Sequence, residues 1–238
     1  MAQQRTGRYP ARVKPFSIIH KDAVQHGIVL GVALPDSSAA VPDHVLEQLH
    51  PEERAYAIDL RGFRQVHWVG GRLAARGALQ ILGCGGPPIL TDPWGAPTSR
   101  QDLSISISHK RHMAVALVAR HEHGSLGVDL EDLSPVREGI EGRVLRPEEI
   151  QEVQSLSASR RWISTLIRFS IKEAIYKALA PRHRRYIGFQ EAAVFPDLDG
   201  TAKVTLHLES GPSPKKLEAR YVWLRRSVLS TVRAKWAP

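Results

Sequence analysis

Hydrophobic and polar residues alternate along several segments of the chain, and this period of two predicts strands. The alternation is clearest from Leu103 to His109, where Ser and Ile take turns, and its hairpin partner is expected at Met113 to Arg120. Short apolar runs between turn-forming residues predict further strands at 27–34, 125–131, 189–195, 202–208 and 217–224.

Two longer segments are predicted to be mainly helical. The first is 51–82, with a break or bend expected near Gly70-Gly71. The second begins at Ser159 or Arg160 and is expected to end before Pro181, because proline disrupts a helix interior. Pro147 suits the first turn of a short helix. Segments rich in Gly, Pro, Ser or charge are expected to be loops, namely 35–43, 83–102, 132–146 and 209–216.

Three segments of the first half recur in the same order in the second half, which suggests two copies of one unit. The pairs are 30–36 with 126–132, 51–53 with 147–149, and 72–79 with 172–179. We therefore expect an α+β fold with an N-terminal pseudo-repeat at 1–124 and a C-terminal pseudo-repeat at 125–238. Each copy would hold an antiparallel sheet and a long helix.

Basic residues outnumber acidic ones, 33 Lys and Arg against 24 Asp and Glu, which gives a net charge of +9. Such a surface attracts anions, and nucleic acid, an anionic membrane, a phosphorylated cofactor or an acidic protein fit about equally well. Cys84 is the sole cysteine, so no intramolecular disulfide forms. No apolar run reaches the roughly eighteen residues of a membrane span. We expect a cytoplasmic protein.

Three carboxylates and a lysine are placed so that they can converge. Asp129 and Glu131 share one face of a predicted strand, and Glu173 and Lys177 share one face of a predicted helix. Clusters of oxygen ligands hold Mg²⁺, usually together with substrate phosphates. The residues predict a magnesium site for chemistry at a phosphate. The alternative is two solvated carboxylates on an exposed strand and an ordinary helix ion pair.

The first copy carries a basic helix face. Arg61, Arg64, Arg72 and Arg76 lie within about 120° of one another around the predicted helix. Guanidinium groups bind phosphate oxygens in a bidentate manner, so this face is a candidate phosphate site. A solvated charged face is the alternative.

Two motifs together resemble the 4′-phosphopantetheinyl transferases of the Sfp type. That family combines Gly-(Val/Ile)-Asp-x-Glu on a strand with (Phe/Trp)-(Ser/Thr/Cys)-x-Lys-Glu-(Ala/Ser)-x-x-Lys on a helix. Residues 127–131 and 169–177 match every defined position, and the resemblance extends from about Arg64 to Lys177. It implies a monomer built as a pseudo-dimer of two similar α+β units, with the active site at the seam.

The resemblance implies a holo-acyl-carrier-protein synthase activity. Such an enzyme transfers 4′-phosphopantetheine from coenzyme A to a serine of an acyl or peptidyl carrier protein and releases 3′,5′-ADP, for fatty acid, polyketide or nonribosomal peptide biosynthesis. Mg²⁺ would be held by Asp129, Glu131 and Glu173. Glu173 would act as general base, and Lys177 would stabilise the leaving phosphate. Lys172 would be a further phosphate contact.

The same resemblance implies a coenzyme A grip in the first copy. Arg72 and Arg76 match a Gly-Arg-x-x-Ala-Arg pattern that grips the phosphates of coenzyme A. Arg64, eight residues upstream of Arg72, would be a second phosphate contact. Ser108 and His109 match the end of a Ser-(Ile/Leu)-(Ser/Thr)-His strand, whose histidine contacts the 3′-phosphate.

One position departs from the family. Trp94 stands where many relatives carry a basic residue, so Lys110 or Arg111 is the alternative source of that phosphate contact.

The remaining expectations concern partners. Carrier proteins are acidic, so a basic surface favours docking, and the basic cluster 182–185 is either part of that surface or a solvated loop. Only the second copy has the carboxylates, which predicts one site per chain, and two self-sufficient copies predict an active monomer. We expect neither a nucleic-acid nor a membrane partner. Two alternatives are a basic nucleic-acid-binding protein, for which no binding module is evident, and an inactive carrier-binding homologue, against which the intact carboxylates argue.

Overall fold

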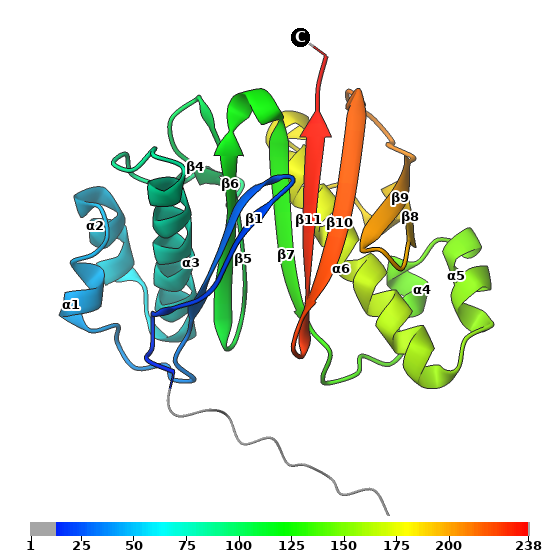
Figure 1. Ribbon diagram of the computed structural model, residues 1–238, viewed down its shortest axis with the longest axis horizontal. Helices are drawn as coiled ribbons and strands as arrows, with labels where there is room; N and C mark the ends of the chain where they lie inside the picture. Colours follow the sequence, from blue (N-terminus) through cyan, green and yellow to red (C-terminus); the bar gives the residue numbers. More distant parts are fainter. Residues whose placement is uncertain (1–12, 238) are drawn as a thin grey trace, which may run out of the picture.

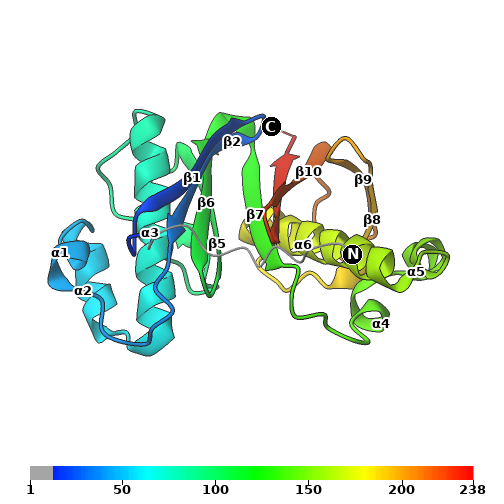
Figure 2. The same ribbon diagram turned by 60° about the horizontal axis from the view of Figure 1, so that its bottom comes forward.

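The computed structural model describes residues 13–237. Two antiparallel sheets stand side by side at its centre, and one long helix packs against each of them (Figure 1). Short helices lie at both outer ends of this arrangement, and Figure 2 shows the same order of layers from below. None of the helices in the described part of the chain is long and apolar enough to cross a membrane.

The first sheet has the strand order β1-β2-β6-β5. Its strands are β1 (Ile18–Val24), β2 (Gly27–Ala33), β5 (Leu103–Lys110) and β6 (Met113–Arg120). Helix α3 (Gly62–Ile81) packs on this sheet against β2 and β6. The shorter elements around it are α1 (Asp43–Leu46), α2 (Pro51–Asp59), β3 (Leu90–Thr91), β4 (Pro97–Thr98) and the 3₁₀ turn η1 (His121–His123).

The second sheet has the strand order β7-β11-β10-β9-β8. Its strands are β7 (Ser125–Asp132), β8 (Ala192–Pro196), β9 (Thr201–Leu206), β10 (Lys216–Leu224) and β11 (Ser227–Lys235). Helix α6 (Ala158–His183) packs against β7 and β11. The shorter elements are α4 (Glu141–Val144), α5 (Pro147–Gln154) and η2 (Phe189–Glu191).

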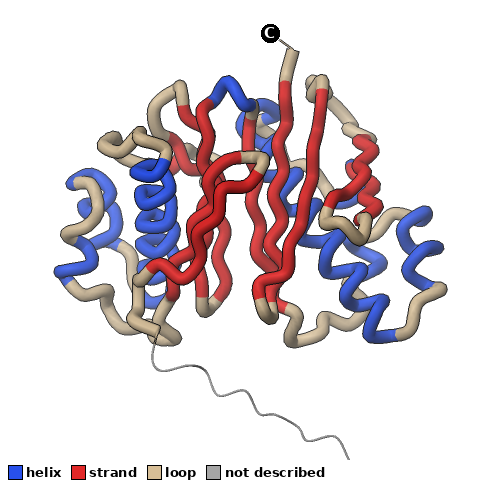
Figure 3. The backbone as a smooth tube through the Cα atoms, viewed as in Figure 1, coloured by secondary structure: helices blue, strands red, loops and turns tan. Residues whose placement is uncertain are grey.

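Apolar residues three or four positions apart explain why α6 lies on this sheet. Ile171, Ile175 and Leu179 recur every four residues and are all at most 1% exposed. They pack against the inner face of the second sheet, where Val232 is part of the same core. The predicted α+β fold of two similar units, each with an antiparallel sheet and a long helix, is confirmed (Figure 3).

The predicted bend at Gly70-Gly71 is wrong, because α3 runs unbroken through both residues. The glycines serve packing instead. A Cβ at Gly70 would lie 2.2 Å from Leu34 Cδ2, and one at Gly71 would lie 2.8 Å from Ile107 Cγ2. The helical segment expected at 51–82 is interrupted earlier, between α2 and α3.

The second long helix was expected to end before Pro181, and this prediction is also wrong. Helix α6 includes Pro181 in its last turn and ends at His183, and its C-cap residue Arg184 takes a left-handed conformation at φ 50°. Proline has no N–H to donate to Lys177 O, but only two helical residues follow it, so little of the helix lies beyond the missing bond. Ala180 O still accepts the Arg184 N–H at 2.8 Å.

Most strands lie where the hydrophobic pattern predicted them, but β1 and β11 were missed, as were the two-residue strands β3 and β4 in the segment expected to be a loop. Strand β1 is an exposed edge strand whose side chains are mostly solvated. Strand β11 is buried along nearly its whole length between β7 and β10. Its polar residues, such as Ser230, Thr231 and Arg233, interrupt the apolar run that a buried strand usually shows in the sequence. Residues 189–191 form η2 rather than the start of a strand.

Serine side chains join the two sheets at the seam between β5 and β7. Ser106 Oγ accepts the Val128 N–H at 2.9 Å, and Ser108 Oγ accepts the Leu130 N–H at 3.4 Å. Serine hydroxyls of β5 thus bind backbone N–H groups of β7 in place of backbone–backbone hydrogen bonds between these two strands. The alternating serines therefore link the two sheets. The strands before and after residue 124 fall in different sheets. The division into repeats at 124 stays a prediction.

The core is continuous across this seam. Val115 and Leu117 of β6 belong to the same buried cluster as Val128 and Leu130 of β7. The two units therefore share one hydrophobic layer, and side chains on either side of the seam hold fixed positions relative to each other.

Candidate active site

Gly127 allows α6 to lie directly on β7. A Cβ at this position would lie 1.8 Å from Ala174 O, which is backbone of α6 and cannot yield as a side chain would. The glycine of the strand motif is thus required by close backbone approach. Since Ala174 follows Glu173, this contact brings the helix carboxylate to the strand that carries Asp129.

Asp129 lies at the centre of a hydrogen-bonded group that spans the seam. Its carboxylate is 4% exposed, and Oδ1 accepts from Ser108 Oγ at 3.0 Å and from Lys177 Nζ at 2.8 Å. Lys177 Nζ also donates to Ser108 Oγ and to Val128 O, both at 3.0 Å. The other oxygen, Oδ2, is buried and finds no hydrogen-bond partner within residues 13–237.

Glu131 is held by two cations. Lys110 Nζ donates to Oε1 at 2.6 Å, and Arg137 Nη2 donates to Oε2 at 2.6 Å. Burial raises the pKa of Glu131, and the neighbouring charge of Asp129 raises it further, while Lys110 and Arg137 oppose the shift. Both oxygens of this carboxylate are therefore engaged with the protein itself.

Glu173 is half-buried on α6, beside the other two carboxylates. Burial raises its pKa, and the charges of Asp129 and Glu131 raise it too, while Lys177 lowers it. A carboxylate with a raised pKa binds a proton more readily, which suits a general base. Since the charges of both Asp129 and Glu131 act on Glu173, the three carboxylates share one electrostatic environment.

The predicted three-carboxylate metal site stays a prediction. No group of three or more His, Cys, Asp and Glu side chains in the described residues is arranged to hold a metal ion as it stands. Two observations fit a hard divalent cation nonetheless. The oxygen Oδ2 of Asp129 is buried without a partner, and the nearby donors are carboxylates, the ligands that Mg²⁺ takes.

Lys172 was expected beside the phosphate face, and the structure places it elsewhere. The residue is 3% exposed, and its Nζ donates to Glu149 Oε2 at 2.5 Å, to Val144 O at 2.7 Å and to Phe189 O at 3.0 Å. All three N–H groups of the ammonium are thus used inside the protein. Lys172 thus fixes α4, α5 and η2 to α6, and a phosphate contact by this residue, which stays a prediction, would compete with these bonds.

Arg72 has a comparable internal role in the first copy. Its Nε donates to Ile89 O at 2.7 Å, and its Nη2 donates to Leu90 O at 3.1 Å and to Thr91 Oγ1 at 2.7 Å. The guanidinium also lies over the Trp68 ring, 4.3 Å from its centroid. Burial lowers the pKa of Arg72 to about 10. The phosphate contact of Arg72 stays a prediction, and such a contact would compete with these hydrogen bonds.

A buried glutamate anchors each copy, and the sequence analysis missed its role. Glu53 accepts the Ile89 N–H at 2.7 Å and pairs with Arg76 at 3.3 Å. Glu149 accepts the Val194 N–H at 2.8 Å and pairs with Lys172. Both glutamates are fully buried. The signal was the repeated Pro-Glu-Glu at 51–53 and 147–149, because an acidic residue recurring just after a helix start is typical of a cap.

The remaining predicted cofactor residues occupy distinct positions. Arg64 is exposed on α3, whereas Arg76 is partly engaged with Glu53. His109 stacks on His67, with ring centroids 4.4 Å apart. His109 is exposed by surface area, yet desolvation of its ring by the neighbouring groups lowers its pKa to about 4, and the charges of His67 and Lys177 lower it further. Ser108 is buried and bonded to the carboxylate cluster rather than open to solvent.

The alternative basic residues are already paired. Lys110 contacts Glu131, as described, and Arg111 pairs with Asp36. Trp94 is 64% exposed on the loop before β4. In the 182–185 cluster, Arg185 makes a bidentate pair with Glu191 at 2.9 and 2.6 Å, so part of that cluster stabilises the fold.

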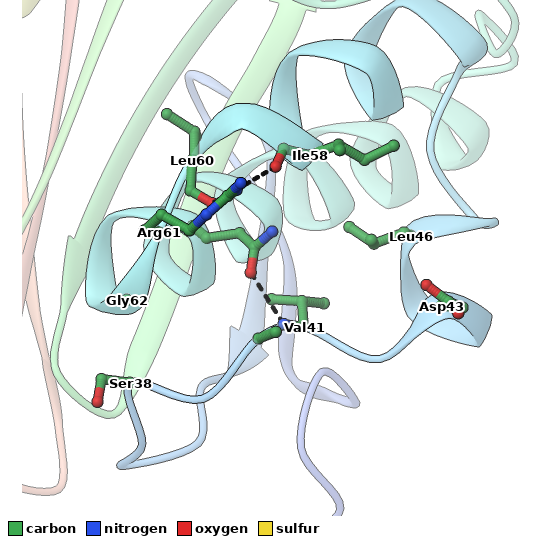
Figure 4. Close-up of a pocket in the computed structure, with 10 residues that line it drawn as sticks. Ser38, Val41, Asp43, Leu46, Ile58, Leu60, Arg61 and Gly62 are labelled. Carbon is green, nitrogen blue, oxygen red and sulfur yellow. Dashed lines mark hydrogen bonds between the residues drawn. The ribbon is translucent and has the colours of Figure 1, made fainter.

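A pocket of about 440 Å³ lies between α1, α2 and the start of α3 (Figure 4). Arg61 donates to Ile58 O across it, and Gln65 Oε1 accepts the Val41 N–H at 2.9 Å. Arg61 of the predicted basic helix face lines this pocket, but neither the three carboxylates Asp129, Glu131 and Glu173 nor the residues of the predicted coenzyme A grip do.

Comparison with known proteins agrees with this geometry. Residues 125–232 match the 4′-phosphopantetheinyl transferase superfamily, and residues 53–119 match the 4′-phosphopantetheinyl transferase N-terminal domain. The chain is 32% identical over 175 residues to the 4′-phosphopantetheinyl transferase Svp of Streptomyces mobaraensis, covering 72% of this chain and 70% of that protein. It is 31% identical to the 4′-phosphopantetheinyl transferase Npt of Nocardia iowensis, covering 64% and 69%.

Among solved structures, a holo-(acyl-carrier-protein) synthase from Bacillus anthracis is similar at 18% identity and a TM-score of 0.40, covering 47% of this chain and 96% of that chain. The sequence matches define a transferase enzyme. The chain belongs to the 4′-phosphopantetheinyl transferase family, which confirms the resemblance drawn from its two motifs.

Proposed function

We propose that this enzyme transfers the 4′-phosphopantetheine group of coenzyme A to a serine hydroxyl of an acyl or peptidyl carrier protein and releases 3′,5′-ADP. The observation that carries the proposal is the cluster at the seam, in which Asp129, Glu173 and Lys177 share one electrostatic environment. The names of the relatives, all from one transferase family, support the same reaction.

In the proposed step, Glu173 takes the proton of the carrier serine, and the serine oxygen attacks the β-phosphorus of coenzyme A. The new O–P bond forms as the bond from that phosphorus to the bridging oxygen breaks, and the electron pair leaves with 3′,5′-ADP. Lys177 would stabilise the negative charge on the leaving phosphate. The raised pKa of Glu173 supports the role of base.

Asp129, Glu131 and Glu173 are the residues that we propose to hold Mg²⁺. When bound, the ion would neutralise charge on the pyrophosphate oxygens. The unpartnered Oδ2 of Asp129 supports this, because a buried acceptor without a donor costs about 1–3 kcal/mol unless a ligand satisfies it. Glu131 is expected to contribute least, because Lys110 and Arg137 already occupy its oxygens.

Coenzyme A would approach the first copy along α3 and the end of β5. Arg64 is an exposed cation on this side, and His109 is the proposed contact of the 3′-phosphate. The low pKa of His109 leaves its ring neutral near pH 7, so it would offer an N–H as a neutral donor. An arriving phosphate dianion would raise that pKa again and favour a charge-assisted hydrogen bond.

Incubation with coenzyme A, Mg²⁺ and a panel of carrier proteins, followed by intact-mass spectrometry, tests the proposal. The carrier should gain the mass of one 4′-phosphopantetheine, and a carrier with the acceptor serine replaced by alanine should stay unchanged. Binding of carriers without added mass would favour the inactive homologue. Retention of nucleic acid instead of coenzyme A would favour the nucleic-acid alternative. The cytoplasmic location and the monomeric state remain proposals.

A further inference from the structure

Two histidines from different elements stack face to face next to the proposed cofactor site. His67 lies on α3, and His109 lies near the end of β5, two elements that pack together (Figure 2). Their ring centroids are 4.4 Å apart, and their planes differ by only 26°. Two imidazoles this close and this nearly parallel fix each other's plane.

Stacking, and not hydrogen bonding at Nε2, holds the His67 ring. The Nε2 atom of His67 is buried and has no hydrogen-bond partner in the part of the chain that the structure describes. His67 also lies near Phe63, whose ring centroid is 5.9 Å away, and the Arg111 guanidinium lies over Phe63 at 5.2 Å. His67 is thus in contact with two flat side chains, His109 and Phe63.

The surroundings keep both imidazoles neutral near pH 7. Burial lowers the pKa of His67, and desolvation of its ring lowers the pKa of His109 to about 4. The charged groups around His109 are Lys177 and Lys110, which lower its pKa, and Asp129, which raises it. Two neutral rings can stack without mutual repulsion, so the pair is stable in the free protein.

We propose that His67 is a positioning residue for recognition of the cofactor's 3′-phosphate: by stacking on His109, it fixes the plane in which that ring presents its N–H. The inference rests on the proposed function. A recognition group that is held in its bound orientation loses less freedom when the ligand arrives, so the ligand binds more tightly. His67 itself touches no reacting atom.

The test measures discrimination between coenzyme A and dephospho-coenzyme A, which differ only in the 3′-phosphate. Dissociation constants from isothermal titration would be compared for the parent, His67→Leu, His67→Phe and His109→Ala. Leucine fills the space without a flat ring, whereas phenylalanine keeps a ring that can stack. His112→Ala is the matched control, because this exposed histidine pairs with Asp132 and not with either ring.

The parent should prefer coenzyme A. In His67→Leu the preference should fall by about two- to tenfold, the range expected for loss of one aromatic contact, while dephospho-coenzyme A binds as before. His67→Phe and His112→Ala should keep the parent's preference. Combining His67→Leu with His109→Ala should reduce the preference no further than His109→Ala alone, because the two residues act as one unit.

Each contrary outcome has a distinct meaning. An unchanged preference in His67→Leu, with loss of preference in His109→Ala, would overturn the role of His67 and leave the proposed function standing. Equal loss in His67→Leu and His67→Phe would also overturn it, because stacking would then be irrelevant. A parent that binds coenzyme A and dephospho-coenzyme A equally would overturn both this inference and the proposed reading of the 3′-phosphate by His109.

Discussion

Gly127→Ala should cripple the enzyme by moving α6 rather than by removing any chemical group. The new Cβ would lie 1.8 Å from Ala174 O, and such contacts are essentially never shorter than 3.0 Å. The helix backbone must therefore retreat from β7 by about 1.2 Å, taking Glu173 away from Asp129. A misplacement of about 1 Å in a reacting group can cost on the order of 100-fold in rate.

The fold should survive this change at a moderate cost. Overpacking a well-packed core typically costs about 1–3 kcal/mol, and a backbone clash falls at the upper end of that range. Turnover of a carrier protein and urea unfolding would be measured on the same preparation. We expect a loss of about two orders of magnitude in kcat with a native circular dichroism spectrum.

The internal duplication supplies a matched control. Gly31 is the equivalent glycine of the first copy, and a Cβ there would lie 2.0 Å from Met113 Cε, the mobile end of a flexible side chain. Gly31→Ala should therefore destabilise the protein slightly and leave turnover near that of the parent. Parent-like turnover in Gly127→Ala, or equal losses in both variants, would refute the reasoning.

Three further predictions concern charge. Lys172→Met should cost about 3–5 kcal/mol in unfolding free energy, because it leaves Glu149 buried without its partner. Lys216→Met, which removes an exposed lysine paired with Glu218, should cost at most about 1 kcal/mol, and similar losses in both variants would argue against a structural role of the Lys172–Glu149 pair. Glu173→Gln should be inactive yet more stable than the parent at pH 7. The raised pKa of Glu173 means that folding disfavours its ionised form. The parent's stability should therefore fall as the pH rises from the ordinary carboxyl pKa of 4.5 through the raised pKa, and the glutamine variant should lack this loss. The acidic limb of the parent's kcat/KM profile, which reports the free enzyme, should accordingly lie above pH 4.5, and a limb at or below that value would contradict the raised pKa. Asp129→Ala should abolish Mg²⁺ binding measured by titration calorimetry, and Glu131→Ala should weaken it less; the reverse order, or activity unaffected by excess EDTA, would remove the metal assignment.

The sequence predicted the strand and helix that carry the site because their constraints are local. The glycine two residues before Asp129, the alternation along β7 and the spacing from Glu173 to Lys177 are each visible within one element. The structure adds that Gly127 is needed for backbone contact with α6, which a single segment cannot reveal.

Long-range partners explain what the sequence did not predict. Arg72 and Lys172 have the appearance of free cations, but their acceptors are carbonyl groups from distant loops, such as Ile89 O and Phe189 O. Gly70 predicts a bend from its own residue type, but its lack of a side chain instead leaves room for Leu34 to pack against α3. In each case the deciding partner belongs to another element.

The contacts between the two sheets were also not predictable from a single segment of the sequence. The alternating serines of β5 correctly predicted a strand, but their hydrogen bonds to Val128 and Leu130 join two sheets. Pairing of His67 with His109 likewise depends on how α3 packs on β5, so no local pattern marks it.

The central claim is that the seam cluster transfers phosphopantetheine, and one time course tests it most directly. Parent and Glu173→Gln would be mixed with coenzyme A, Mg²⁺ and an apo carrier protein, and carrier mass and 3′,5′-ADP would be measured together. The account predicts one 3′,5′-ADP released for each carrier modified by the parent, and neither product from Glu173→Gln. Carrier modification by Glu173→Gln at the parent's rate, or 3′,5′-ADP formed without carrier modification, would contradict it.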